Sequence, residues 1–318
     1  MLLAGIDIGT LTCRLLIADV STDLAMKEIE SDRQILRLGE GVDEKRCLSP
    51  AAMSRVVKTL CEWRDRMEVY PLAGVAVVAT SAVREATNRE EFVANVKSEA
   101  GFEVEILNGD EEARRTLLGI QSGLPAEVDE FLGIDIGGGS TEFMRAHNTK
   151  LIEQPHVYSL DLGVVRLTER EFHTDDPPSD PALFAAEEVI QGELEKIRGG
   201  LGDLSGMTCV GTAGTITTLA AMAQKLSHYE SARIHNYRLS LEKIQQLEKE
   251  LRRRTRLERR DIPGLEQGRE DVIVAGTVIL RVVIQTLGFQ ECLVSDYGLR
   301  EGILVHEANR LRSSKSKV

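Results

Sequence analysis

The sequence predicts an α/β protein made of two similar halves, and a duplicated block is the first observation behind this prediction. The later copy is the stretch GIDIGGGSTE at 133–142, and the earlier copy is GIDIGT at 5–10. Their aspartates, Asp7 and Asp135, lie 128 residues apart (135 minus 7). The second observation is that apolar runs of strand length alternate with helical patterns through both halves. A length of 318 residues also favours two domains.

Charge and cysteine usage limit the possible partners and compartments. The net charge of −12 argues against a general affinity for nucleic acid or for a membrane surface. Five cysteines form no CxxC pair, which is typical of a reducing compartment and untypical of a zinc site. No basic leader precedes the first strand, and no apolar run is long enough to cross a bilayer. We therefore expect a cytoplasmic protein with no membrane partner and no specific nucleic-acid partner.

The first half predicts a mixed succession of strands and helices. Apolar runs bounded by turn residues predict its strands, at 2–8, 13–20, 33–38, 74–79 and 104–107. Ser49-Pro50 predicts a helix start, because a capping residue precedes a proline at the first helical position. Asn88 with Glu91 predicts a capping box that opens a helix ending at Gly101. Residues 108–110 then lead into a helix that carries Glu111 and Glu112.

The second half repeats this plan after a break at 122–125, so we expect domains at 1–124 and 125–299. Its strands are expected at 131–136, 142–146, 207–210 and 291–294. Its helices are expected up to Arg198, from about Ile216, from Leu241, at 271–287 and at 303–311. The strand, loop and helix at 74–85 match those at 207–216, so a second loop position also repeats.

The glycine-rich block at 133–142 predicts a phosphate-binding loop. Glycine permits φ > 0 and the close approach of a ligand, and successive N–H groups can form an anion-binding concavity. Ser140 and Thr141 add hydroxyl donors. Asp135 and Glu142 bracket the loop and could hold Mg²⁺ between their carboxylates and phosphate oxygens. An ordinary tight turn could have the same composition, but the repeat near the N-terminus favours the functional interpretation.

The candidate loops together contain the groups that phosphoryl transfer needs, namely N–H donors, hydroxyls, arginines and strand-end acids. No Ser/His or Cys/His pairing indicates a protein nucleophile, and the six histidines share no pattern, so we expect them on the surface or satisfied in the core. The base must then be a carboxylate. Glu111 and Glu112 are equal candidates by position, and a solvated acid at a helix start would explain either one.

A run of arginines from Arg252 to Arg260 has two interpretations. Cations at the C-terminal end of a helix complement its dipole and face water, which is the favoured interpretation. The alternative is a basic rim that guides a polyanion.

Six blocks in order resemble the exopolyphosphatase / guanosine pentaphosphate phosphohydrolase family. They are GIDIGT-x-TCRLLIAD, ATSAVREATN, LNGDEEAR, GIDIGGGSTE, GTAGTITTLA and SDYGLREGIL. The resemblance implies the actin/Hsp70/sugar-kinase superfold, with two ribonuclease-H-like domains and the active site in the interdomain cleft. It also implies that the final helix, at 300–318, packs on the first domain, and it leaves open a homodimer formed through the second.

The resemblance further implies residue roles. Glu112 would be the base that orients the attacking water, and Asp135 and Glu142 would hold Mg²⁺ or another divalent cation. Phosphates would be held by Gly9, Thr10, Thr12, Arg14, Arg84, Gly137, Gly138, Gly139, Ser140, Thr141, Gly211, Thr212, Gly214 and Thr215. Water would attack the terminal phosphorus of polyphosphate or guanosine pentaphosphate and release orthophosphate.

Two departures from the family pattern qualify this prediction. Leu11 stands where the family often has Asn, so one side-chain contact to phosphate is lost. The sequence stops after the second domain, whereas longer members carry further helical domains that help to grip a long chain, so the resemblance does not extend to processivity or to a preference for long polyphosphate. A kinase of the same superfold and a sensor without turnover remain alternatives. The Glu-Glu-Ala-Arg block and the block at 137–142 favour the phosphatase.

Overall fold

The computed structural model describes residues 1–148 and 156–315. The chain forms two compact units: unit 1 is Met1–Ser122 with Gly298–Val318, and unit 2 is Gly123–Tyr297. The domain limits expected from the sequence differ by two residues at each connection (124 against 122, and 299 against 297). Among the helices of the described residues, none combines the length and the apolar composition that a membrane crossing needs.

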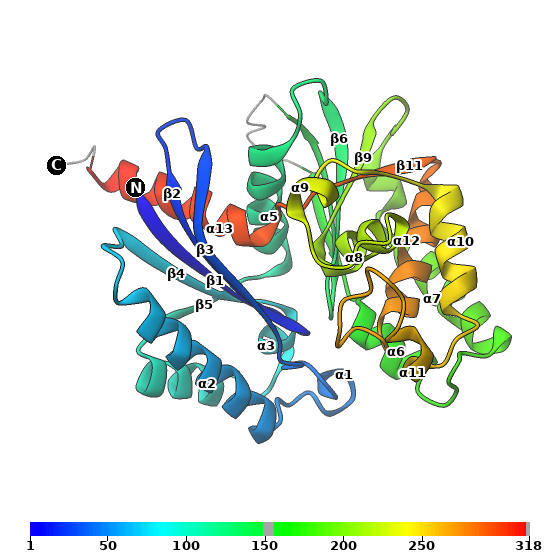
Figure 1. Cartoon of the computed structure of the whole chain (residues 1–318), viewed down its shortest axis with the longest axis horizontal. Coiled ribbons are helices and arrows are strands. Elements are labelled where there is room, and N and C mark those ends of the chain that lie inside the picture. Colours follow the sequence, from blue (N-terminus) through cyan, green and yellow to red (C-terminus); the bar gives the residue numbers. More distant parts are fainter. Residues whose placement is uncertain (149–155, 316–318) are drawn as a thin grey trace. The chain divides into compact units, whose positions relative to one another are not determined.

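Unit 1 contains a five-stranded sheet in the order β3-β2-β1-β4-β5 (Figure 1). The strands are β1 (Leu2–Ile8), β2 (Thr12–Val20), β3 (Met26–Ile35), β4 (Gly74–Ala79) and β5 (Val104–Ile106). β2 is antiparallel to both β1 and β3, whereas β4 and β5 run parallel to β1. The carboxyl ends of β1, β4 and β5 therefore meet at one edge of the sheet.

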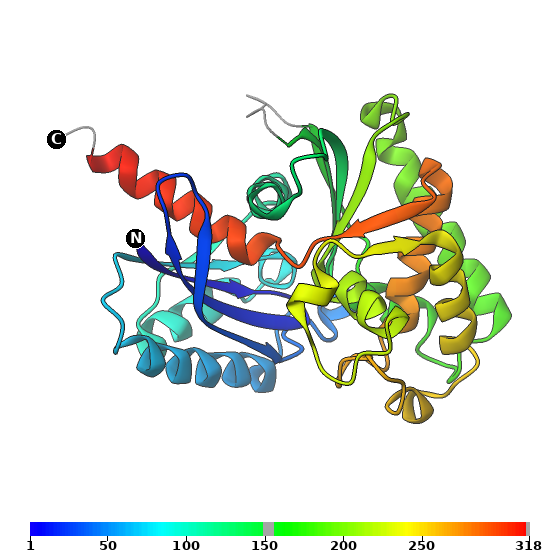
Figure 2. The same ribbon diagram turned by 45° about the horizontal axis from the view of Figure 1, so that its top comes forward.

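Different helices cover the two faces of this sheet (Figure 2). The helices of unit 1 are α1 (Val42–Lys45), α2 (Pro50–Met67), α3 (Ser81–Glu85), α4 (Arg89–Asn95), the π-helical turn η1 (Val96–Ala100), α5 (Gly109–Gly123) and α13 (Leu299–Lys315). On one face, Ile6 and Leu15 share a core with Trp63 of α2. On the other face, Leu3 shares a core with Leu304 of α13. This split follows from the two-residue period of a strand.

Two local predictions for unit 1 were wrong. The third strand is Met26–Ile35 rather than 33–38, because it pairs with β2 along its whole length, from Thr12↔Ile35 to Val20↔Met26. This edge strand is mostly polar and lacked an apolar pattern. The Asn88 side chain also forms no capping box, because it bonds both the N–H of Leu48 (2.9 Å) and its carbonyl (3.0 Å). The start of α2 was predicted correctly, since Ser49 accepts a bond from the Ala52 N–H at 3.2 Å.

Unit 2 contains a six-stranded sheet in the order β10-β11-β9-β6-β7-β8. The strands are β6 (Glu130–Ile136), β7 (Thr141–His147), β8 (His156–Leu160), β9 (Thr208–Thr212), β10 (Arg238–Ser240) and β11 (Glu291–Val294). β7 is antiparallel to both β6 and β8, whereas β9 and β11 run parallel to β6. Apart from the extra edge strand β10, this is the topology of unit 1. Each unit is therefore a ribonuclease-H-like α/β domain, as the family resemblance implied.

The helices of unit 2 pack around the apolar helix α12. They are α6 (Val164–Glu171), α7 (Asp180–Leu201), α8 (Ala213–Ala223), α9 (Ser231–Ile234), α10 (Leu241–Leu251), α11 (Arg256–Arg259) and α12 (Ile273–Leu287). α12 contacts α6, α7, α8 and α10, and its buried residues lie on all sides, as expected for a helix surrounded by others. Ser240 caps α10 by accepting from the Lys243 N–H at 3.2 Å, as predicted.

Candidate functional site

The two units build the same tight hairpin at the end of their first strand. In unit 1 the Gly9 N–H donates to the Thr12 carbonyl at 3.1 Å, and in unit 2 the Gly137 N–H donates to the Ser140 carbonyl at 3.0 Å. The strand register is also the same, because Asp7 lies opposite Arg14 and Asp135 lies opposite Glu142. The duplicated sequence block is thus a duplicated backbone structure.

The carbonyls of the glycine hairpin in unit 2 are all held on one side. The carbonyls of 137 and 138 accept from the N–H groups of Val164 and Val165 at 3.0 and 2.8 Å, and the carbonyl of 139 accepts from Arg166 Nε at 2.9 Å. In a trans peptide the N–H points opposite to the carbonyl. The N–H groups of 138, 139 and 140 are therefore turned away from α6, as in an anion-binding nest.

The start of α6 approaches this hairpin closely enough to require glycine. A Cβ at Gly163 would lie 2.3 Å from the Gly138 carbonyl oxygen. In unit 1 the residues that follow β3 play the same role, since the Gly39 N–H donates to the Thr10 carbonyl (2.8 Å) and the Arg37 N–H to the Leu11 carbonyl (2.9 Å).

The two hairpins differ in the charge opposite the aspartate. Asp7 faces Arg14, with 4.0 Å between Oδ2 and Nη1. Asp135 faces Glu142, which is 1% exposed and accepts a bond from Ser159 Oγ at 2.8 Å. Like charges directly opposite each other on neighbouring strands repel, so the pair in unit 2 fits a cation. In the part of the chain that the structure describes, no group of three or more His, Cys, Asp or Glu side chains is arranged to hold a metal.

The loop after β9 lies beside residues 295–297, where the chain leaves unit 2. The Ser295 N–H donates to the Gly211 carbonyl at 2.7 Å, and Thr212 Oγ1 donates to the Tyr297 carbonyl at 3.0 Å. Ala213 opens α8 with a φ of 71°, in the left-handed region. Strain of this kind in a non-glycine residue is often kept at functional sites.

The sequence-based reason for the glycines was partly wrong. No positive φ occurs at Gly9, Gly137, Gly211 or Gly214. Close approach explains them instead: a Cβ at Gly9 would lie 2.7 Å from the Thr12 carbonyl oxygen, and one at Gly211 would lie 2.5 Å from Cys292 Sγ.

The structure separates the two candidate acids at the start of α5. Glu112 is 7% exposed, and its Oε2 accepts a bond from Arg84 Nη1 at 2.8 Å. The same Nη1 also donates to the Leu107 carbonyl at 2.9 Å. Glu111 instead accepts from Arg115 Nε at 2.8 Å, one turn along its own helix. Glu112 and Arg84 follow the carboxyl ends of β5 and β4, at the edge of the sheet where open α/β sheets bind ligands.

Comparison with known proteins identifies the family. A model of the Ppx/GppA phosphatase family matches residues 16–311. The chain belongs to the Ppx/GppA phosphatase family. It is 33% identical over 312 residues to exopolyphosphatase 2 of Mycobacterium tuberculosis, covering 94% of this chain and 96% of the relative. The crystal structure of an exopolyphosphatase-like protein is similar at a TM-score of 0.91, with 31% identity over 98% of both chains. The Aquifex aeolicus member of the Ppx/GppA family gives a TM-score of 0.81, with 32% identity over 98% of both chains.

Two of the hydroxyl groups that were expected to contact phosphate in this Ppx/GppA chain donate hydrogen bonds to its own backbone instead. The Thr141 hydroxyl is fully buried and donates to the Leu162 carbonyl, and the Thr212 hydroxyl donates to the Tyr297 carbonyl. Neither hydroxyl proton is available to a phosphate in this arrangement. These threonines would contribute through position and backbone rather than through a hydroxyl donor.

One candidate residue of the Ppx/GppA chain carried no sequence signal. Arg269 is 4% exposed, and a Cβ at Gly214 would lie 2.1 Å from its Nη2. Its Nε donates to Glu266. The guanidinium therefore lies directly against the loop at the start of α8. Arg269 stands in an irregular segment far along the chain, so only the tertiary structure could reveal this contact.

The arginine run between Arg252 and Arg260 is largely a structural feature. Arg259 is 2% exposed and donates to the carbonyls of Leu251 (3.0 Å) and Glu270 (2.9 Å). Burial lowers the pKa of Arg259. Further ion pairs join Arg252 to Asp180, Arg254 to Glu250, Arg256 to Asp271 and Arg260 to Glu270. These pairings argue against a basic rim for polyanions, and buried Arg259 does not face water as the favoured interpretation expected.

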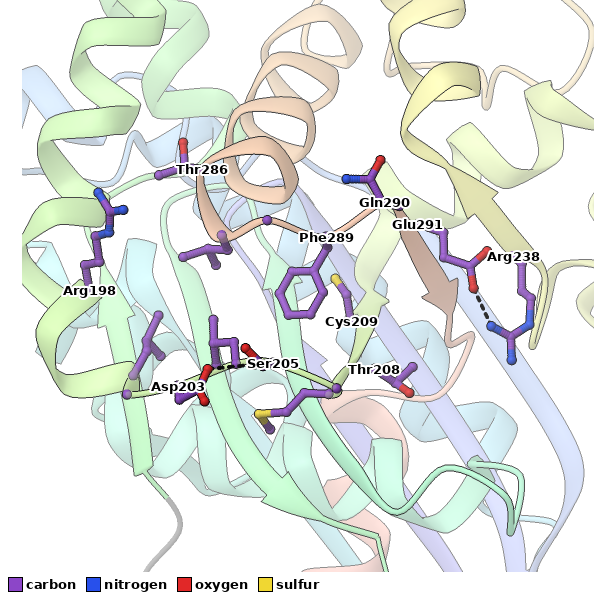
Figure 3. A pocket seen from close by; sticks show the side chains of 17 residues that line it. Arg198, Asp203, Ser205, Thr208, Cys209, Arg238, Thr286, Phe289, Gln290 and Glu291 are labelled. Atoms are coloured by element: carbon purple, nitrogen blue, oxygen red, sulfur yellow. Dashed lines mark hydrogen bonds and ion pairs between the residues drawn. The ribbon is translucent and has the colours of Figure 1, made fainter.

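Unit 2 also contains a cavity of about 520 Å³, and Figure 3 shows the side chains that line it. Its lining includes Thr208 and Glu291, at the amino ends of β9 and β11. The charges of Arg238 and Glu291 in its wall pair with each other. The candidate loops leave the opposite ends of the same strands, so this cavity is not part of the candidate site.

Proposed function

We propose that this protein is a metal-dependent phosphohydrolase that releases terminal orthophosphate from inorganic polyphosphate. The observation that carries the proposal is the pairing of buried Glu112 with Arg84, at the sheet edge that also bears the Gly9 hairpin. The identity to a relative named an exopolyphosphatase supports this choice of substrate.

Glu112 is the proposed base. A carboxylate held by a guanidinium keeps a fixed orientation, and a carboxylate has enough lone pairs to accept a hydrogen bond from water as well. Arg84 donates to Oε2 through Nη1, so its role is to orient Glu112 and to add positive charge near the phosphate. The acceptor in this scheme is water, because no side chain in the candidate site is an activated nucleophile.

The proposed phosphate contacts come from backbone N–H groups. The N–H groups of 138, 139 and 140 turn away from α6 and form the clearest anion site. The equivalent hairpin of unit 1, with Arg14 beside it, forms a second. Arg269 adds charge next to the loop at 211–215. Fixed donors of this kind favour the charge that develops on a transferring phosphoryl group.

Asp135 and Glu142 are the proposed metal ligands, because two carboxylates directly opposite each other repel and a divalent cation between them would remove this repulsion. Mg²⁺ commonly takes one or two protein carboxylates and completes its shell with water and phosphate oxygens. When bound, it would neutralise charge on the phosphate oxygens.

Guanosine pentaphosphate is the second candidate substrate, because the six sequence blocks resemble the exopolyphosphatase / guanosine pentaphosphate phosphohydrolase family. Its 5′-terminal phosphate presents the same chemistry to the same loops. We also propose a cytoplasmic location, since all five cysteines are free, as a reducing compartment would leave them.

The test is phosphate release in Mg²⁺ without any nucleotide acceptor. Short polyphosphate, long polyphosphate and guanosine pentaphosphate are compared in parallel, with the Glu112→Gln variant as the blank. Release from polyphosphate supports the proposal, and release from guanosine pentaphosphate alone makes the protein a nucleotide phosphohydrolase. No release from any of the three by the wild type would contradict it.

A further inference from the structure

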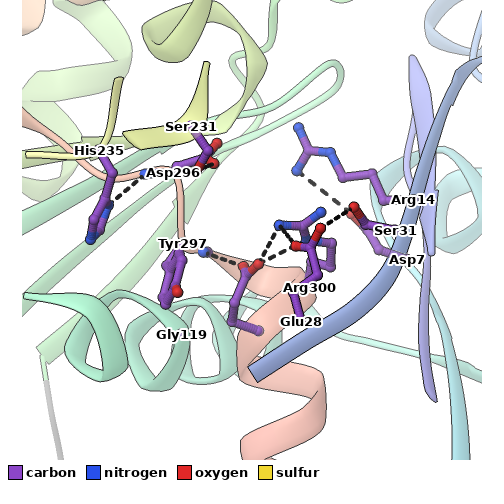
Figure 4. Close-up of polar contacts among 12 residues, drawn as sticks. Asp7, Arg14, Glu28, Ser31, Gly119, Ser231, His235, Asp296, Tyr297 and Arg300 are labelled. Atoms are coloured by element: carbon purple, nitrogen blue, oxygen red, sulfur yellow. Dashed lines mark hydrogen bonds and ion pairs between the residues drawn. The ribbon is translucent and has the colours of Figure 1, made fainter. Parts of the chain in front are cut away.

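One histidine joins both points at which the chain enters and leaves unit 2. These points are Gly123 and Tyr297, the first and last residues of the unit. His235 follows α9, and its Nε2 lies 2.9 Å from the Gly123 carbonyl oxygen. Its ring stacks on Tyr297, with 4.9 Å between the centroids and 22° between the planes (Figure 4). The Asp296 N–H donates to its Nδ1 at 3.2 Å.

The hydrogen bonds of His235 require one form of its ring. A backbone N–H can only donate, so Nδ1 must accept from Asp296 and cannot carry a proton. A carbonyl oxygen can only accept, so Nε2 must carry the proton and donate to Gly123. The neutral Nε2–H tautomer satisfies both bonds together. The ring thus links two backbone segments that are distant in sequence.

The space around Gly123 is filled by the same two rings. A Cβ at Gly123 would lie 2.6 Å from Tyr297 Cδ2 and 3.0 Å from His235 Cε1. The Asp296 carboxylate is tied to the helix that precedes His235, since Ser231 Oγ donates to Oδ2 at 2.6 Å and the Tyr229 hydroxyl donates to Oδ1. The His235 ring is therefore held by Gly123 on one side and by residues 296–297 on the other.

The segment at 295–297 connects this cluster to the loop after β9. The Ser295 N–H donates to the Gly211 carbonyl at 2.7 Å, and the Tyr297 carbonyl accepts from Thr212 Oγ1 at 3.0 Å. Ser295 Oγ also donates to the Tyr297 carbonyl at 2.7 Å, which stiffens the turn. Contacts thus run without a break from Gly123 through His235 to residues 211 and 212.

We propose that His235 is a positioning residue for phosphate binding. It fixes the segment at 295–297 against Gly123, and this segment in turn fixes the loop at 211–215. The proposal rests on the proposed function, because it takes that loop to be a phosphate-binding loop. If His235 had a structural role only, its replacement would lower the stability of the whole unit. If it is a positioning residue, its replacement increases the mobility of the loop at 211–215 and raises KM.

The test compares His235→Ala, His235→Gln and His235→Asn with the wild type. Gln can still donate to the Gly123 carbonyl, and Asn can still accept from the Asp296 N–H, so each keeps one of the two bonds. His228→Ala is the matched control, because the His228 side chain is 74% exposed and contacts its neighbours Ser227 and Glu230. Amide hydrogen exchange is measured over 211–215 and 295–297, and KM and kcat are measured with short polyphosphate and Mg²⁺.

We expect His235→Ala to speed exchange in both segments by about 10-fold or more while exchange in α12 stays unchanged. We expect its KM to rise by roughly 5- to 10-fold, with kcat within about 3-fold of the wild type. Gln and Asn should fall between Ala and the wild type, and His228→Ala should match the wild type.

Unchanged exchange over 211–215 in His235→Ala would overturn the positioning role. So would a uniform rise in exchange across unit 2, which would mean a structural role only. Absence of phosphate release by the wild type would overturn the proposed function, and the exchange result would still decide whether His235 orders the loop.

Discussion

The most informative single residues are the two that lie opposite the paired aspartates. Arg14 places a positive charge 4.0 Å from Asp7 in unit 1, whereas Glu142 adds a second negative charge beside Asp135 in unit 2. The backbone of the two hairpins is the same, so we propose a different ligand for each hairpin from this difference in charge. In this proposal the hairpin of unit 1 binds an anion, and the hairpin of unit 2 binds an anion together with a cation.

We therefore expect Glu142→Gln to weaken metal binding. The loss of one carboxylate should raise the Mg²⁺ concentration for half-maximal activity by about 10-fold or more. It should also reduce the rise in Tm that Mg²⁺ gives the wild type through mass action. Glu130→Gln on the same strand pair is the control, because Glu130 is exposed. An unchanged Mg²⁺ midpoint and an unchanged Tm rise in Glu142→Gln would remove Glu142 from the metal site.

Among single residues, the sequence pointed to those of the duplicated hairpin block, but it gave no sign of the residues outside that block that contact it. The spacing of Asp135 and Glu142 follows from a hairpin of fixed register, and the structure places them opposite each other. Arg269 contacts Gly214 from a distant irregular segment, which no local pattern encodes. The inward hydroxyl of Thr141 was also missed, because its partner Leu162 belongs to a loop with no repeated counterpart.

Among the elements of unit 1, α5 and the start of α13 cross at backbone contact. A Cβ at Gly119 would lie 1.8 Å from the Gly298 carbonyl oxygen, and one at Gly302 would lie 1.7 Å from the Arg115 carbonyl oxygen. At both glycines the backbone of one segment contacts the backbone of the other directly, with no side chain between them. The crossing therefore depends on the absence of Cβ atoms at these two positions.

We expect Gly119→Ala to destabilise the protein by about 3 kcal/mol or more, because backbone atoms cannot move aside as a flexible side chain can. Gly192→Ala in α7 is the matched control, since a Cβ there meets nothing within 4 Å. It should stabilise the protein by about 0.5–1 kcal/mol through helix propensity. Urea unfolding measures both, and equal effects would contradict the proposed crossing.

The tie between β3 and α2 predicts a pH dependence. Burial raises the pKa of Asp32, but hydrogen bonds from Trp63 and Arg66 outweigh it and hold the pKa below its ordinary value of 3.8. Trp63 Nε1 donates to Oδ2 at 2.9 Å. A depressed pKa in the folded state contributes stability that is present above about pH 4 and is lost as the pH falls through the folded value.

Asp32→Asn should therefore cost about 1 kcal/mol at pH 7 and lose less stability than the wild type between pH 6 and pH 3. Asp65→Asn, at an exposed pair with the neighbouring Arg64, should follow the wild type. Urea unfolding across this pH range is the measurement. Parallel pH curves for Asp32→Asn and the wild type would refute the linkage.

Elements with an apolar pattern were predictable and elements without one were not. α2 and α10 were found because a capping residue precedes an apolar face. β3 was misplaced because its polar residues form an edge strand that pairs only with β2. β8 and α6 carried no distinct signal, and their form depends on pairing with β7 and on contact with the glycine hairpin.

For the molecule as a whole, the main feature is that unit 1 is discontinuous and unit 2 is not. Unit 1 needs α13 from the end of the chain, because α13 covers the face of its sheet that bears Leu3, Leu16 and Val20. Without α13 that apolar face would be exposed to water. Unit 2 forms from one uninterrupted segment, 123–297.

We therefore expect the fragment 123–297 to fold alone with a cooperative urea transition. The fragment 1–122 should remain unfolded or aggregate, whereas 1–122 joined by a flexible linker to 298–315 should fold. Circular dichroism and urea unfolding measure all three. Cooperative unfolding of 1–122 alone would show that α13 is dispensable for unit 1.

The proposed chemistry depends on Glu112 more than on any other residue. The decisive measurement is therefore phosphate release from short polyphosphate by the wild type, Glu112→Gln and Glu111→Gln. Calorimetry measures substrate binding by the same three proteins. We predict that Glu112→Gln loses about 10³-fold or more in kcat while it still binds substrate, because the water loses its orienting carboxylate. Glu111→Gln should stay within about 5-fold of the wild type, since Glu111 pairs with Arg115. A Glu112→Gln enzyme as active as the wild type would contradict the assignment of Glu112 as the base.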